Sequence, residues 1–168
     1  YILFLNKMLE LKNKTTITII LLLSIVILLI AFFIQYILGH APCNLCLIER
    51  IPYLLAIIII PTGLFNKKFE KIVLLFLGLI FLAGTIISFY HFGIEQGFFS
   101  ESLVCSTSLE NTNLSKDDLL KELQKNQISC KDVGFKIVGL SLATINTIIS
   151  LLLSVITLKL FLNHEKNK

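Results

Sequence analysis

The sequence predicts an all-α integral membrane protein, built as a four-helix transmembrane bundle, and two observations carry this prediction. Charged residues make up only 15% of the 168-residue chain and hydrophobic residues 55%, whereas a soluble domain carries about 25% charged residues. Four continuously apolar segments are also long enough to cross the hydrocarbon core as helices, which takes about 20 residues each. These segments cover about 17–38, 45–65, 72–90 and 138–158.

Each segment is typical of a membrane helix. The first is longer than a signal-peptide core and lacks a small-x-small cleavage site at its end, so we expect a retained anchor. The second carries Glu49 and Arg50 near its start and also holds Pro52 and Pro61. Because no segment alternates between polar and apolar residues, helices are favoured over the strands of a membrane barrel.

The connections predict how the helices are oriented. Residues 39–44 and 66–71 are short links that force antiparallel neighbours, while residues 91–137 form one long polar loop. Nine lysines fall on one side of such a four-span arrangement, and the positive-inside rule makes that side cytoplasmic. We therefore expect both termini inside, and residues 39–44 and 91–137 outside. The nine are Lys7, Lys12, Lys14, Lys67, Lys68, Lys71, Lys159, Lys166 and Lys168.

This orientation places all four cysteines on the outer face, where an oxidising compartment permits disulfides. Cys105 and Cys130 lie in the long loop and bracket residues 113–128, which are patterned as a short amphipathic helix. We expect this helix to cover the bundle or lie on the membrane surface, and docking of a partner is the alternative. A disulfide between the two cysteines would close a loop of about 25 residues.

The stretch HAPCNLCLIER places Cys43 and Cys46 at the outer end of the second span. Pro42 suits a helix entry, and the positive end of a helix stabilises a thiolate. Arg50 lies four residues after Cys46, so in a continuous helix the two share a face and the guanidinium favours the thiolate further. A short Cys-x-x-Cys loop is typical of redox exchange.

Other uses of this dithiol are less well supported. A zinc half-site is disfavoured because no histidine partner stands at metal spacing, and we predict no metal. Haem attachment needs a histidine directly after the second cysteine, where Leu47 stands. A purely structural disulfide stays open for the dithiol, as does a snorkelling membrane anchor for Arg50.

Two dithiols on one face suggest a relay that moves electrons by thiol–disulfide exchange. The loop pair is accessible to a soluble protein, and the pair at the lipid boundary to a lipid-soluble two-electron acceptor such as a quinone. His91, at the predicted outer end of the third span, is a candidate to bond a quinone carbonyl or handle its proton. Gln35, near the outer end of the first span, is a weaker candidate.

The combined pattern resembles the disulfide bond formation protein B (DsbB) family of the bacterial inner membrane. The resemblance covers nearly the whole chain, as one domain over 1–168. It includes CNLCLIER after the first span, YHFGIEQG after the third, a cysteine pair in the second outer loop, and CKDVGFKIVGLSLATIN entering the fourth span. It implies a quinone-dependent protein disulfide oxidoreductase with its cysteines on the periplasmic side.

The resemblance also implies individual roles. Cys105 would form a mixed disulfide with a periplasmic DsbA-like oxidase of thioredoxin fold, and Cys130 would resolve it. Cys43 would exchange with the loop cysteines. Cys46 would face ubiquinone (or menaquinone) as a thiolate supported by Arg50, with His91 at the quinone. The implied partners are this oxidase, the quinone pool and the bilayer, with no nucleic acid.

Two alternatives remain at this point. A vitamin K epoxide reductase-like protein also couples a Cys-x-x-Cys to quinones in a four-helix bundle, but there the motif is expected on the last span. The other alternative is a non-catalytic membrane subunit with two structural disulfides. It predicts cysteines that never form a mixed disulfide with a soluble partner.

Overall fold

The computed structural model confirms the all-α architecture and adds a small hairpin. It describes residues 2–66, 68–101, 105, 129–131, 135–137 and 139–166. The amphipathic helix predicted over 113–128 lies outside these residues. The helices are α1 (Ile2–Tyr36), α2 (Asn44–Ile48), α3 (Ile51–Phe65), α4 (Glu70–Glu95) and α6 (Leu142–Lys166), and the strands are β1 (Lys136–Ile137) and β2 (Leu140–Ser141).

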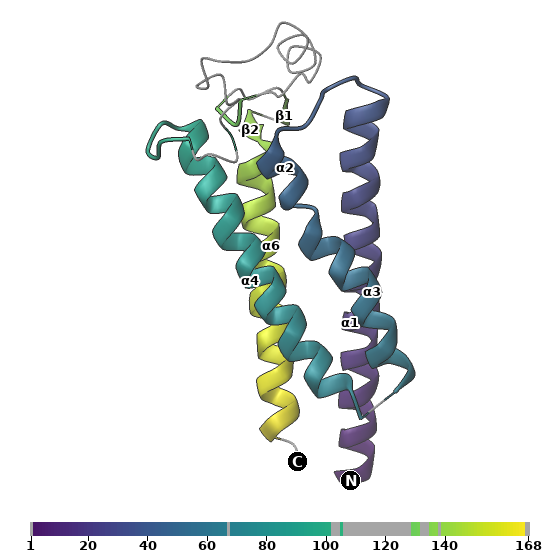
Figure 1. Ribbon diagram of the computed structural model, residues 1–168. Helices are drawn as coiled ribbons and strands as arrows, with labels where there is room; N and C mark the ends of the chain where they lie inside the picture. Colours follow the sequence, from purple (N-terminus) through teal and green to yellow (C-terminus); the bar gives the residue numbers. More distant parts are fainter. Residues whose placement is uncertain are drawn as a thin grey trace, which may run out of the picture.

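The long helices pack in chain order, α1 on α3, α3 on α4 and α4 on α6. Figure 1 shows that α1 begins and α6 ends at the same end of the bundle, while α2, β1 and β2 lie at the opposite end. Four helical stretches are long and apolar enough to cross a membrane: Lys14–Tyr36, Asn44–Phe65, Glu70–Glu95 and Leu142–Asn163. The chain is therefore a multi-pass membrane protein.

The second span is two helices rather than the continuous helix predicted over 45–65. Pro52 has no N–H, so the carbonyl of Ile48 loses its helical donor and the chain turns at Glu49 and Arg50. Arg50 N instead donates to Leu47 O at 3.2 Å, a tighter turn than in an α-helix.

Two other predicted boundaries need correction. The third span continues to Glu95, so His91 lies inside α4 rather than at its end. The fourth span begins at Leu142, not near 138, because β1 and β2 form a tight antiparallel pair before it. Gly139, in the turn of this pair, has φ +82°, which favours glycine.

Close contact between α4 and α6 depends on a small residue. A Cβ at Gly78 would lie 2.5 Å from Leu158 Cδ2, closer than atoms pack. The approach also brings Ser154 Oγ within 3.1 Å of the Gly78 carbonyl, to which it donates. Small residues and interhelical hydrogen bonds of this kind are typical of helix association in membranes. The core that results includes Tyr53, Leu77 and Phe81, each at most 2% exposed.

Candidate redox site

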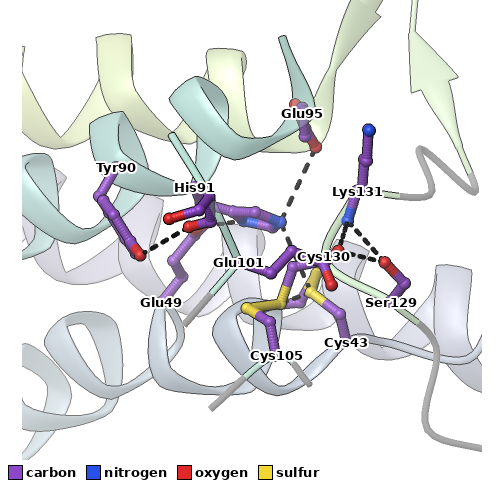
Figure 2. Close-up of a disulfide and its surroundings, with 12 residues drawn as sticks. Cys43, Glu49, Tyr90, His91, Glu95, Glu101, Cys105, Ser129, Cys130 and Lys131 are labelled. Carbon is purple, nitrogen blue, oxygen red and sulfur yellow. Dashed lines mark hydrogen bonds and ion pairs between the residues drawn. A yellow bond between two sulfur atoms is a disulfide. The ribbon is translucent and has the colours of Figure 1, made fainter. Parts of the chain in front are cut away.

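All four cysteines meet in one buried cluster, as two disulfides, at the end of the bundle that carries α2. The pairs are Cys43–Cys46 and Cys105–Cys130. The Sγ atoms of Cys43 and Cys130 and the Nε2 atom of His91 all lie within 4.8 Å of one another. Figure 2 shows the Cys105–Cys130 disulfide next to Cys43, with the imidazole of His91 beside them. Exchange between the pairs therefore needs only small movements.

The start of α2 distinguishes the two cysteines of the first pair. Cys43 is the N-cap residue, and its Sγ accepts a hydrogen bond from the Cys46 backbone N–H at 3.2 Å. This confirms the predicted placement of the dithiol at a helix start. Cys43 is buried at 5% exposure, whereas Cys46 is only half-buried.

His91 lies between two carboxylates and a sulfur atom. Its Nδ1 is 2.6 Å from Glu49 Oε1, and its Nε2 is 3.5 Å from Cys43 Sγ and 3.9 Å from Glu95 Oε1. The side chains of His91, Glu49 and Glu95 are 4%, 9% and 6% exposed. The close carboxylate accepts a hydrogen bond from Nδ1, so in the neutral imidazole the Nε2 lone pair points toward Cys43. This arrangement is able to take a proton from a Cys43 thiol.

A chain of polar side chains continues from Glu49 into the bundle. Glu49 Oε2 accepts from Asn146 Nδ2 at 2.8 Å, and Asn146 Oδ1 accepts from the Tyr53 hydroxyl at 2.5 Å. The same hydroxyl lies 3.0 Å from Ser150 Oγ. The sequence reading gave no role to Glu49, Asn146, Tyr53 or Glu95. The polarity of Glu49, Tyr53 and Asn146 inside predicted spans was the available signal, because polar groups in a membrane mark functional sites; Glu95 fell in the predicted loop over 91–137 and carried no such signal.

Arg50 faces α1, away from the histidine. Its Nη1 donates to Gln35 Oε1 at 2.6 Å, and its guanidinium carbon lies 5.3 Å from the centre of the Phe32 ring. The structure thus joins two predicted site residues, Arg50 and Gln35, that are 15 positions apart. The pairing of Arg50 with Cys46 on one helix face stays a prediction: the two residues line the same cavity, and α2 ends at Ile48 between them.

A cavity of about 260 Å³ connects these groups. Its wall is mostly apolar and comes from all the helices, including Ile34 of α1 and Ile145 of α6. Cys46, Arg50 and Glu95 supply polar groups to it. Among the described residues, Glu95 Oε2 is the buried side-chain oxygen or nitrogen without a hydrogen-bond partner. An apolar pocket with a few polar groups is typical of small-molecule sites.

Comparison with known proteins agrees with this geometry. Residues 13–160 match the family described as Disulfide bond formation protein DsbB, a range that includes all four cysteines and His91. An uncharacterized protein of Rickettsia prowazekii (strain Madrid E) is 31% identical over 147 residues, which cover 86% of this chain and 85% of the relative. The chain therefore belongs to the DsbB family of membrane thiol oxidoreductases, which act in disulfide bond formation.

Proposed function

We propose that this protein reoxidises a periplasmic DsbA-like dithiol oxidase and passes two electrons to membrane ubiquinone or menaquinone. The observation that carries the proposal is the contact group of Cys43, Cys130 and His91, whose Sγ and Nε2 atoms lie within 4.8 Å of one another. Two structural disulfides need no such proximity or a buried histidine beside them. The proposed cycle converts the partner's dithiol and a quinone into the partner's disulfide and a quinol.

The proposed orientation has both termini in the cytoplasm and the cysteines on the periplasmic side of the bacterial inner membrane. Its support is that α1 begins, α3 ends, α4 begins and α6 ends at one end of the bundle, where the lysine-rich stretches stand (Figure 1). The disulfide cluster lies beside α2 at the other end. Positive charge favours the cytoplasmic side and disulfides the periplasmic side.

Cys105 is the proposed entry point for the partner. A thiolate of the reduced partner attacks Cys105 Sγ, a new intermolecular disulfide forms, and Cys130 leaves as a thiolate. Cys130 then attacks Cys43, and Cys46 leaves as a thiolate. The support for this order is that Cys130 belongs to the close group with Cys43 and His91. The partner's second thiolate releases the partner as a disulfide.

His91 and Arg50 are the proposed supports of the membrane-edge thiols. When the Cys105 thiolate displaces Cys43 from Cys130, Cys43 leaves as a thiolate; Nε2 of His91 takes up the proton that would otherwise neutralise this thiolate, and Glu49 stabilises the imidazolium through Nδ1. Arg50 lines the same cavity as Cys46 and supplies a fixed positive charge beside it. The positive charges of the His91 imidazolium and of Arg50 therefore stabilise the thiolates of Cys43 and Cys46.

The cavity fits the head group of a quinone. Its wall is mostly apolar, and Arg50 and the unpartnered Glu95 oxygen offer polar contacts. A quinone, when bound, accepts two electrons and two protons. Cys43 and Cys46 both line this cavity, and Cys46 is the more exposed of the two.

A mixed-disulfide trap tests the proposal. With Cys130→Ala, Cys105 is a free thiol, so its thiolate attacks the disulfide of an oxidised DsbA-like partner, the partner's second sulfur leaves as a thiolate, and with no Cys130 to break the new bond the partner is expected to remain attached to Cys105. The adduct should be absent from a Cys105→Ala control. A non-catalytic subunit predicts no adduct in either variant. In the second half of the test, a reduced partner should drive reduction of a ubiquinone analogue by the unmodified protein but not by Cys46→Ser.

A further inference from the structure

We propose that the fully reduced protein binds one zinc ion through Cys43, Cys130 and His91, and that this ion holds the protein in its reduced, inactive form. The inference needs only that both disulfides open. It goes beyond the proposed function, and its central test uses a chemical reductant in place of the partner and of quinone.

The three donor atoms already have nearly the spacing that zinc requires. Bond lengths of about 2.0–2.3 Å in a tetrahedral site place ligand atoms about 3.3–3.8 Å apart. Cys43 Sγ and His91 Nε2 are 3.5 Å apart, and no pair in the group exceeds 4.8 Å. All three residues are at most 5% exposed. Small side-chain movements are thus enough to close the site.

The histidine is prepared for metal binding by its second nitrogen. Glu49 Oε1 accepts a hydrogen bond from Nδ1 at 2.6 Å, so in the neutral imidazole the Nε2 lone pair is directed at Cys43 Sγ. Asn146 donates to the other oxygen of the same carboxylate at 2.8 Å. A carboxylate behind a zinc-bound histidine fixes its ring orientation and raises its basicity.

Glu95 places a second carboxyl group beside the open fourth position. Its Oε1 lies 3.9 Å from His91 Nε2, and its Oε2 has no hydrogen-bond partner although the side chain is only 6% exposed. An unsatisfied buried carboxylate oxygen costs free energy unless it gains a proton or a cation. A metal ion at the three donors would supply that positive charge.

Redox state controls access to this site. Disulfide sulfur is not a thiolate, so the oxidised protein lacks two of the three ligands. In the reduced protein, zinc displaces one proton from Cys43 and one from Cys130, and no electron moves. The bound thiolates are then unavailable to each other and to Cys46. Zinc should therefore slow reoxidation, and a chelator should restore it.

Cobalt is the direct probe, because its thiolate complexes absorb light. The full chain in detergent is reduced with a phosphine, freed of reductant without oxygen, and titrated with Co²⁺ and then with competing Zn²⁺. We expect one ion per chain with thiolate-to-cobalt absorption, and none in the oxidised protein. Glu49→Gln should lower the affinity about 10- to 100-fold, the usual effect of losing such a support.

Matched cysteine variants make the proposal specific. Cys46→Ser with Cys105→Ser removes one sulfur from each pair and should keep the cobalt spectrum, whereas Cys43→Ser with Cys130→Ser should lose it. Equal loss in both double variants, or no ion in the reduced protein, would overturn the site. Circular dichroism confirms that each variant is folded. The mixed-disulfide trap with the partner tests the proposed function independently of the zinc site. If cobalt binds but no partner adduct forms, only the proposed function is rejected. If the partner adduct forms but cobalt does not bind, only the zinc site is rejected.

Discussion

Replacement of Glu49 by glutamine tests the central contact of the site. Glutamine keeps the size of the side chain but removes the negative charge, and it replaces one acceptor oxygen with an amide NH2. Glu49 now accepts from His91 Nδ1 at 2.6 Å and from Asn146 Nδ2 at 2.8 Å. Because both partners are donors, one of them would face the NH2 group of the variant.

The expected magnitude follows from the burial and length of the contact. Glu49 is 9% exposed at its side chain, and hydrogen bonds to a charged group contribute about 1.5–3 kcal/mol. If that support is lost when His91 takes the Cys43 proton, the rate should fall about 10- to 150-fold, since about 1.4 kcal/mol corresponds to tenfold.

The assay isolates Cys43 as the only thiol. With Cys46, Cys105 and Cys130 replaced by serine or alanine, the rate of Cys43 alkylation at fixed pH reports its thiolate reactivity. Glu49→Gln should slow alkylation by the factor given above. Glu70→Gln is the matched control, because Glu70 is a buried carboxylate, 5% exposed, at the other end of α4. Alkylation of the Glu49→Gln variant as fast as that of its parent would refute the role of the Glu49–His91 contact.

Three further substitutions probe the surroundings of the site. Arg50→Lys loses the planar contact with the Phe32 ring on α1 and the fixed hydrogen bond to Gln35. The loss of about 1–2 kcal/mol of binding free energy should raise the KM for a quinone analogue about 5- to 30-fold. A change in kcat alone would contradict this prediction. Tyr53→Phe removes an interhelical hydroxyl and should lower the free energy of unfolding by about 0.6–1.7 kcal/mol in detergent, with an unchanged Tm as the contrary result. Gly78→Ala places a methyl group against Leu158 and should destabilise by about 1–3 kcal/mol. Adding Leu158→Ala should give a double variant less destabilised than the sum of the two, and simple additivity would show that the two sites do not touch.

The boundaries of the spans show what the hydropathy pattern of the sequence predicts and what it does not. Hydropathy located all four spans, because the membrane requires long apolar helices whatever their partners. It could not place the break after Ile48, although Pro52 was visible, since a membrane helix often continues through proline when neighbours satisfy the freed carbonyl. It also missed the β1–β2 pair, because two-residue strands carry no periodic signal.

The sequence identified most of the site residues but not the contacts between them. Cys43, Cys46, Cys105 and Cys130 were identified from spacing and topology, and His91 from its place near a span end. Their functional roles remain predictions that the trap and alkylation experiments test. Metal binding was disfavoured because the histidine stands 48 residues from Cys43, a spacing that no local motif reveals.

The sequence alone determined that the chain has four segments long and apolar enough to cross a membrane, with one cysteine pair at the start of the second and the other between the third and the fourth, because apolar length and residue identity suffice for both. Only the tertiary structure decided which groups meet. It turned Glu49 toward α4 and α6 and Arg50 toward α1, and it placed His91 against Cys43. These contacts depend on how three separate helices pack and on a turn imposed by one proline, and neither follows from the apolar pattern of any single helix.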